Sequence, residues 1–267
     1  MIDSVADVLL QEDRELAAQH NSDSELSPKE LCSFLPLVFS VSRGSLGRVT
    51  ELAMFPLGSV LFPHMPVLLR VFEDRYLIML SRILKSEPAE FGVVLIERGQ
   101  EIGGGEHRFA IGTVAQIAQL ETTDALVGLV AEGDRRVEVV QWLEDDPFPR
   151  ADIRVLDELV WEEALRPLRE RAEQTVRRAL AQASEFSDQA WSATVELSEQ
   201  PVAAAWQLAA IAPLGPLDQV TLLRSTSMRQ LLDTVIELTI AAGQALDDAA
   251  LDGGPDDDLG DTDWLDD

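Results

Sequence analysis

The sequence predicts an α+β protein, in which a small β-barrel with one inserted helix precedes a C-terminal α-helical bundle. Apolar residues alternate with a period of two from Leu52 to about residue 159, and the period becomes 3.6 from Trp161 onward. Gly, Pro and Asp separate the short apolar runs, as they do at turns between strands. The predicted segments are an N-terminal extension (1–50), a barrel domain (51–159), a helical bundle (160–246) and a disordered acidic tail (247–267).

Seven segments of the barrel domain have the alternation that is typical of β-strands. They are residues 52–57, 67–72, 91–98, 109–120, 124–131, 135–143 and 150–159. The "AEGD" stretch between the fifth and sixth segments predicts a hairpin, beside which Arg135 and Arg136 lie. Many short strands favour a closed or nearly closed barrel, antiparallel or mixed, because closure removes unpaired sheet edges.

One helix is inserted between the second and third of these strands. Apolar residues from Leu77 to Leu84 have helical spacing, and Pro88 ends the pattern. Glu73 and Asp74 precede this run, and acidic residues favour a helix N-terminus. The sequence therefore predicts a helix that begins at these acids.

The second half of the chain predicts helices separated by proline and glycine. The segments are 161–186, 187–199 (with a Ser-Asp cap), 201–213, 215–225 and 226–246. Pro167 either kinks the first helix or lies in its first turn.

The two ends of the chain differ from its middle. Residues 1–50 are either a poorly ordered extension or a mis-called start, with translation beginning near Val49 or Met54. Residues 247–267 hold ten Asp and no Lys or Arg, so we expect them to be disordered. Trp264 and Leu265 are an apolar pair in this tail, and they form either a docking element or part of a solvated tail.

Composition excludes several classes of partner. With 48 acidic and 21 basic residues, the net charge of −27 argues against nucleic-acid binding. Cys32 is the only cysteine, so an intramolecular disulfide or a cysteine metal cluster is excluded. The sequence shows neither a secretory signal nor a bilayer-spanning run. We therefore expect a cytoplasmic protein without a membrane partner, and the excess of Arg over Lys and of Ala suggests a bacterial host.

No catalytic or cofactor motif stands out. The chain has no P-loop pattern, and His20, His64 and His107 have no His or Cys partner at metal-ligand spacing. Lys85 lies at the end of the inserted helix, where a cation favours the helix dipole. We therefore predict a non-enzymatic protein with no cofactor, no metal and no catalytic residue.

The stretch "LAMFPLGSVLFPHMPVLLRVFEDRYLIML" (52–80) resembles the start of the N-terminal, substrate-binding domain of the Lon-type ATP-dependent proteases. That family opens with a Pro-Leu strand, a Leu-Phe-Pro turn, a second Pro-Leu strand and a Glu-x-Arg-Tyr helix start. The resemblance covers about residues 52–242. The matching residues, which we expect to hold the fold, are Pro56, Phe62, Pro63, Glu73, Arg75, Tyr76, Gly112 and Arg136. Tyr76 is expected to pack the helix on the barrel, and either Arg75 or Arg136 to pair with Glu73.

The chain also departs from the family pattern. His64 stands where the family often has Gly, and Val137 stands where it has an aromatic residue. The sequence lacks the family's ATPase and peptidase domains, so proteolysis and ATP hydrolysis are not carried over to it.

The resemblance implies a PUA-like barrel, a helical bundle and a protein-binding role. We expect an adaptor or holdase for unfolded or tagged protein segments, with a protease or chaperone as a further candidate partner. The alternative is binding of a small molecule or peptide fragment in the barrel mouth. A cryptic hydrolase and an RNA-binding protein are weaker candidates.

Unfolded protein is recognised through exposed apolar surface. The large residues expected in loops, and thus the candidate client contacts, are Phe62, Met65, Trp142 and Phe148. Trp142 and Phe148 flank "LEDDP" and are the best pair. The competing interpretation is that each side chain packs in the core.

Overall fold

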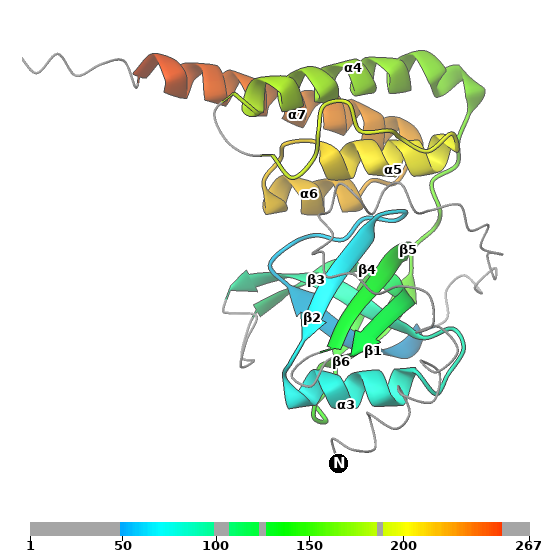
Figure 1. Ribbon diagram of the computed structural model, residues 1–267. Helices are drawn as coiled ribbons and strands as arrows, with labels where there is room; N and C mark the ends of the chain where they lie inside the picture. Colours follow the sequence, from blue (N-terminus) through cyan, green and yellow to red (C-terminus); the bar gives the residue numbers. More distant parts are fainter. Residues whose placement is uncertain (1–48, 99–106, 123–126, 186–188, 253–267) are drawn as a thin grey trace, which may run out of the picture.

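The computed structural model describes residues 49–98, 107–122, 127–185 and 189–252 (Figure 1). Its strands are β1 (Val49–Leu57), β2 (Pro66–Val71), β3 (Glu90–Arg98), β4 (His107–Thr122), β5 (Val127–Trp142) and β6 (Arg150–Val155). Its helices are α3 (Asp74–Ile83), a 3₁₀ turn (Glu163–Leu165), α4 (Arg166–Ala183), α5 (Pro201–Ile211), α6 (Pro216–Leu223) and α7 (Met228–Asp252). The predicted α+β class and the inserted helix are thus confirmed. The predictions for residues 1–48, which include His20 and Cys32, and for Trp264-Leu265 lie outside the described residues.

The strands form one six-stranded sheet in the order β2-β5-β4-β3-β1-β6. β5 also pairs with β6, so that β5, β4, β3, β1 and β6 are hydrogen-bonded in a closed cycle. β1 and β3 are parallel, and the connection between them carries β2 and α3. β2 lies outside this cycle and pairs with β5 alone among the described strands.

The predicted hairpin at residues 131–134 is wrong, because β5 continues through it. Glu132 pairs with Pro66 of β2 on one side and with Gln116 of β4 on the other. A Gly-Asp pair is a common turn signal, but here partners on both sides keep the backbone extended. Two predicted strands therefore form one strand, and Arg135 and Arg136 lie inside it.

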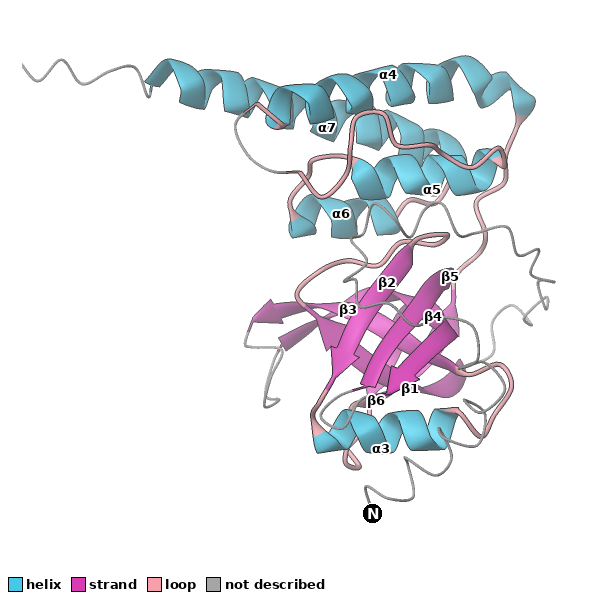
Figure 2. Cartoon of the chain, in the orientation of Figure 1, coloured by secondary structure: helices cyan, strands magenta, loops and turns pink. Residues whose placement is uncertain are grey.

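Figure 2 shows α4, α5, α6 and α7 together at one end of the sheet and α3 at the opposite end. Pro167 lies in the first turn of α4, which confirms one of the two alternatives predicted for this residue. α7 continues to Asp252, past residue 246, where the helical bundle was expected to end. No helix in the described part of the chain is long and apolar enough to cross a membrane.

Two groups of buried side chains stabilise the fold. The larger extends from the sheet into the helices, and Phe62 meets Trp206 there with a ring-centroid distance of 6.1 Å. The smaller, which we call the strand-ring core, takes side chains from every strand of the closed cycle. Its members are Met54, Val94, Val114, Val137, Val139, Ala151 and Ile153.

Candidate functional site

The turn between β1 and β2, which carries the Leu-Phe-Pro motif, is bound to the sheet from several directions. The Thr113 hydroxyl donates a hydrogen bond to the carbonyl oxygen of Leu61 at 2.6 Å. The Gly133 amide donates to the carbonyl oxygen of Met65 at 2.9 Å, and the His64 amide donates to that of Gly133 at 2.7 Å. A Cβ at Gly133 would lie 2.2 Å from the carbonyl oxygen of Phe62, so only glycine permits this approach.

His64 has φ of 60°, in the left-handed region that favours glycine. Glycine adopts this conformation without strain, which explains why a glycine suits the position after the Leu-Phe-Pro turn that His64 occupies here. Burial lowers the pKa of His64, and the carboxylates of Asp134 and Glu158 partly oppose that shift. The side-chain amide of Gln207 donates to the His64 carbonyl oxygen at 3.5 Å, which connects the turn to α5.

Arg136 joins the sheet to the helices. Its guanidinium donates hydrogen bonds to the carbonyl oxygens of Leu223 and Ser225, each at 2.7 Å, and to that of Asp157 at 2.7 Å. Desolvation by burial lowers the pKa of Arg136, and the Asp157 carboxylate opposes this shift. Because its described partners are backbone carbonyls, Arg136 does not form the ion pair with Glu73 that was one of two expectations.

Arg75 is the partner of Glu73. Its Nε lies 3.0 Å from a carboxylate oxygen of Glu73, the residue that precedes α3. Tyr76 is 2% exposed, and its ring stacks on Phe55 of β1 at a centroid distance of 4.0 Å. This stacking packs α3 against the sheet.

The remaining motif residues lie inside the fold. Pro56 pairs with Val94 within the sheet, and Pro63 is buried. A Cβ at Gly112 would lie 2.0 Å from the carbonyl oxygen of Val93, so Gly112 lets β3 and β4 approach closely. The contacts described for the motif residues are therefore internal to the protein.

The structure does not form a surface from the four candidate client contacts. Phe62, Met65 and Phe148 are 1%, 6% and 3% exposed, so the expectation that they present apolar surface is wrong. Trp142 is partly buried beneath the guanidinium of Arg108, at 4.6 Å from its ring centroid. Phe148 belongs to the larger core, whereas Trp142 packs against the strand-ring core, so the two do not form a pair.

Two exposed apolar side chains do lie close together in the chain, one on β2 and one directly after it. The described residues expose large apolar side chains at Val49, Leu68, Phe72, Val140, Val160, Leu217 and Ile240. Leu68 is 47% exposed and Phe72 is 54% exposed, and the buried Leu69 and Val71 alternate with them. Leu68 and Phe72 are therefore on one face, with the exposed Arg70 between them, and we call these two apolar residues the edge strip. Sequence alternation in "VLLRVF" is the signal that predicts this face, but it does not predict that β2 is an edge strand.

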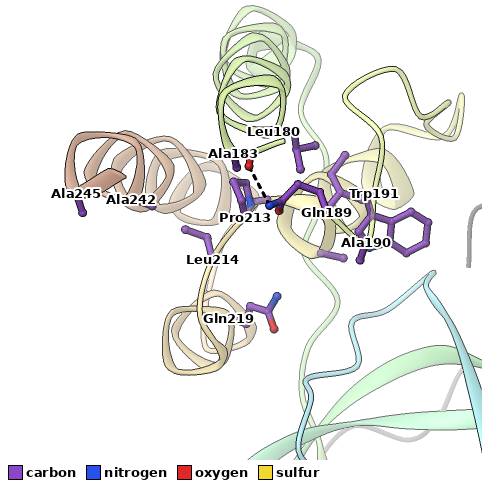
Figure 3. Close-up of a pocket in the computed structure, with 13 residues that line it drawn as sticks. Leu180, Ala183, Gln189, Ala190, Trp191, Pro213, Leu214, Gln219, Ala242 and Ala245 are labelled. Atoms are coloured by element: carbon purple, nitrogen blue, oxygen red, sulfur yellow. Dashed lines mark hydrogen bonds between the residues drawn. The ribbon is translucent and has the colours of Figure 1, made fainter. Parts of the chain in front are cut away.

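A hollow of about 560 Å³ lies among the helices (Figure 3). We call it the helical hollow. Its apolar lining includes Leu180, Trp191, Ile211 and Leu214, and its polar lining includes Gln189 and Gln219. An apolar wall with few polar groups is typical of a site for a neutral, apolar ligand.

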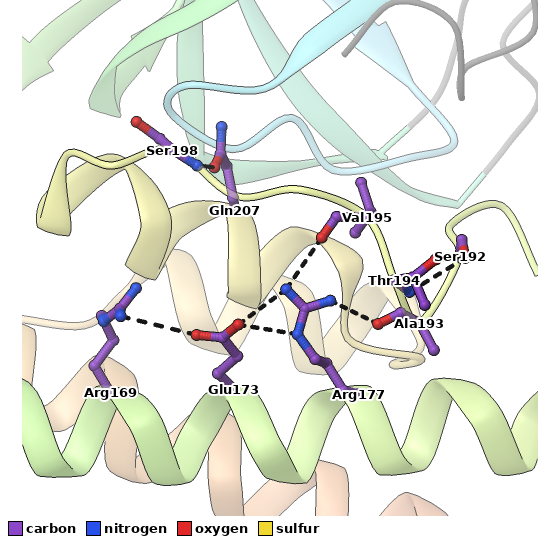
Figure 4. A network of polar contacts seen from close by, with 9 residues as sticks. All are labelled: Arg169, Glu173, Arg177, Ser192, Ala193, Thr194, Val195, Ser198 and Gln207. Atoms are coloured by element: carbon purple, nitrogen blue, oxygen red, sulfur yellow. Dashed lines mark hydrogen bonds and ion pairs between the residues drawn. The ribbon is translucent and has the colours of Figure 1, made fainter. Parts of the chain in front are cut away.

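A polar network holds the chain just after Trp191, which lines the hollow (Figure 4). The guanidinium of Arg177 on α4 donates to the carbonyl oxygens of Ala193 at 2.6 Å and Val195 at 3.1 Å, and to Glu173 at 2.9 Å. Arg169 lies 3.8 Å from the same Glu173 carboxylate. Residues 189–200 are irregular, so the predicted helix at 187–199 is wrong for its described part. The guanidinium of Arg177 binds the carbonyls that a helix would pair internally.

Comparisons with known proteins relate most of the chain to one family. The sequence profile described as "ATP-dependent protease La (LON) substrate-binding domain" matches residues 51–240. A Lon protease of Halothermothrix orenii is 24% identical over 141 residues, which are 52% of this chain and 16% of that protease. The match therefore spans less than one fifth of the protease.

Solved structures include similar folds. The N-terminal domain of the Lon protease of the Mycobacterium avium complex is 16% identical with a TM-score of 0.51, and the match covers 72% of this chain and 98% of that one. A Lon N-terminal domain protein from Xanthomonas campestris is 25% identical with a TM-score of 0.49, over 70% of this chain and 98% of that one.

Proposed function

Because the chain belongs to the family of ATP-dependent protease La (LON) substrate-binding domains, we propose that it binds unfolded or tagged segments of other proteins. In this proposal it acts in the cytoplasm as an adaptor or holdase without catalysis of its own. The proposal takes the closed cycle of strands as the PUA-like barrel and α4 to α7 as the helical bundle. A protease or chaperone that receives the bound segment is a further proposed partner.

The observation that carries the proposal is the edge strip. An unfolded polypeptide exposes apolar side chains and backbone groups that a folded protein buries. A protein that binds it must therefore present apolar surface and hydrogen-bonding groups that complement them. Leu68 on β2 and Phe72 directly after it present apolar area on either side of the exposed Arg70, whereas the other large exposed apolar residues lie on other parts of the described chain. Covering the exposed part of each side chain contributes about 1 kcal/mol, or roughly fivefold in affinity.

Fluorescence anisotropy with a labelled, permanently unfolded polypeptide tests the proposal. The full chain is titrated at two salt concentrations, and we expect saturable micromolar binding that persists at the higher one. The double variant Leu68→Ser, Phe72→Ser should bind at least tenfold more weakly. Leu217→Ser is the matched control, because Leu217 is 67% exposed but lies on α6.

The result that would overturn the proposal is equally direct. If the native chain shows no saturable binding up to about 100 μM, a scale of roughly 5–6 kcal/mol, the protein is not a holdase for such segments. An equal effect of the edge-strip and control variants would remove the edge strip as the site.

A second candidate function is binding of a small apolar molecule or a peptide fragment. The helical hollow favours it, although this site lies among the helices and not in the barrel mouth. Ala245 lines the hollow and is exposed, so Ala245→Phe should fill part of it without disturbing the core. A fragment that raises the melting temperature of the native chain but not of this variant would support the second function.

A further inference from the structure

We propose that the helical hollow binds a small molecule with an apolar body and a positively charged head group, of the kind that an aryl or alkyl amine provides. This inference rests on the second candidate function above and deepens it, because that function leaves the head group of the ligand open. It does not depend on the edge strip, which lies on a different part of the described chain.

The walls of the hollow determine the body of the ligand. They come from the C-terminal parts of α4 and α5, from α6, from α7 and from the irregular segment that includes Trp191 (Figure 3). None of the described residues that line the hollow carries a charge, and the polar side chains among them, Gln189 and Gln219, are neutral amides. Contacts with Leu180, Trp191 and Leu214 would therefore favour a ligand whose larger part is apolar.

Pro213 leaves the last turn of α5 short of hydrogen-bond donors. In a helix each carbonyl accepts from the N–H four residues later, and Pro213, which has no N–H, stands four residues after Ala209. The next amide, that of Leu214, donates instead to the Ala212 carbonyl oxygen at 2.7 Å. The carbonyl oxygens of Ala209 and Ala210 thus lose their usual helix donors, and Ala210 lines the hollow. A ligand with N–H groups supplies the donors that this end of α5 lacks.

The electrostatic surroundings favour a positive head group over a negative one. α4 and α5 both end with residues that line the hollow, and the C-terminal end of a helix carries partial negative charge. The acidic residues that stand close to lining residues in the sequence are Glu185 after α4, Asp218 on α6, and Asp247 and Asp248 on α7. An ammonium group is therefore attracted to this site and a carboxylate is repelled.

Two arginines on α4 precede the lining residue Leu180, and neither of them lines the hollow. The guanidinium of Arg177 donates to the Glu173 carboxylate and to two backbone carbonyls, so its charge is already compensated. Arg178 is exposed, whereas Leu180 two positions later is buried, so Arg178 lies on the opposite side of α4. Neither arginine therefore offers an anionic ligand a partner within the hollow.

Three ligands that share one body test the head group. They are phenylpropylamine, phenylpropanol and phenylpropionate, which are positive, neutral and negative at neutral pH. Each is titrated into the full chain, and binding is followed by the indole N–H signal of Trp191 in NMR spectra. We expect the amine to bind at least fivefold more tightly than the alcohol, and the carboxylate to bind more weakly than the alcohol. Added salt should narrow these differences, because it screens charge.

Two phenylalanine substitutions on α7 locate the site. Ala245 lines the hollow and is exposed, so Ala245→Phe should fill part of the hollow and weaken binding of the amine at least tenfold. Ala241→Phe is the matched control, because Ala241 is also exposed on α7 but does not line the hollow. This control should bind the amine like the native chain, and equal binding by the two variants would overturn the proposal.

The outcomes separate this inference from the function on which it rests. If the alcohol binds as tightly as the amine, and Ala245→Phe weakens both, the hollow binds small molecules but the preference for a positive head group is overturned. If none of the three ligands shifts the Trp191 signal up to about 5 mM, the second candidate function fails together with this inference.

Two other occupants would also overturn the proposal. The first is the tail of this chain, where Trp264 and Leu265 are apolar but Asp263 and Asp266 flank them, so we expect the hollow to repel it. The double variant Trp264→Ser, Leu265→Ser should bind the amine like the native chain, and tenfold tighter binding would show that the tail fills the hollow. The second is an unfolded polypeptide, which would displace phenylpropylamine from the native chain if the hollow were its site.

Discussion

The guanidinium of Arg136 lies over the indole ring of Trp206, with its carbon 5.0 Å from the ring centroid. Arg136 belongs to β5 and Trp206 to α5, so this contact spans the boundary between sheet and helices. The same guanidinium binds the carbonyl oxygens of Leu223 and Ser225, which lie at the end of α6 and just after it. The sheet and the helices thus share a buried cation.

Arg136→Lys should lower the free energy of unfolding by about 2–4 kcal/mol. A lysine carries the charge but cannot donate to three carbonyls in fixed directions or stack its planar group on Trp206. Urea denaturation monitored by tryptophan fluorescence measures the change. Arg154→Lys, on an exposed side chain of β6, is the control and should shift the midpoint little. An unchanged midpoint for Arg136→Lys would contradict the assigned role.

Gly133→Ala should lower the free energy of unfolding by about 1–3 kcal/mol. Its Cβ would lie 2.2 Å from the carbonyl oxygen of Phe62, so the turn or β5 must shift. Gly215→Ala is the matched control, because nothing lies within 4 Å of a Cβ there. Thermal unfolding of both variants gives the comparison. Equal melting temperatures would show that the turn is not held tightly against β5.

His64 should make stability fall as the pH drops below its unfolded pKa of 6.5. Burial lowers its pKa in the folded state, so between the lowered value and 6.5 the unfolded chain binds more protons. Stability therefore rises with pH in that window. His64→Asn retains a residue that tolerates positive φ and should remove this part of the pH dependence.

The comparison with His64→Asn is needed because the titration of Glu132 changes the stability with pH in the opposite direction. Burial raises the pKa of Glu132, and the Asp134 carboxylate adds to that shift, so its contribution falls as pH rises above 4.5. Urea midpoints of both proteins between pH 5 and 8 isolate the histidine. If the two curves are parallel, His64 does not titrate as described.

Arg177→Gln should loosen residues 189–198 without unfolding the helices. Its guanidinium holds the carbonyl oxygens of Ala193 and Val195, and the shorter amide cannot reach both. Hydrogen exchange should accelerate in that segment, and any ligand of the helical hollow should bind more weakly. Arg178→Gln, on the neighbouring exposed residue of α4, should leave both readouts unchanged.

The sequence predicted much of the local structure. The change of period near Trp161 marks the passage from strands to helices, and Glu73, Asp74 and Pro88 bracket the inserted helix as expected. The apolar patterns succeed because they report which side chains are buried along a single element, and that information is local.

Predictions failed where distant partners decided the outcome. The "AEGD" stretch forms a strand because β2 and β4 pair with it on both sides. Residues 189–200 form no helix, and Arg177 binds the carbonyl oxygens of Ala193 and Val195 within this segment. Phe62, Met65 and Phe148 are core residues because the turns that carry them fold inward.

The sequence alone determined where the strands give way to helices, the place of the inserted helix, the Leu-Phe-Pro turn and the family resemblance. Only the tertiary structure decided that β2 pairs with β5 alone among the described strands, that Leu68 and Phe72 stay exposed, and that Arg136 joins the sheet to the helices. The reason is physical. Alternation shows that a strand has a buried and an exposed face, but strand order arises from backbone pairing between residues far apart in the chain.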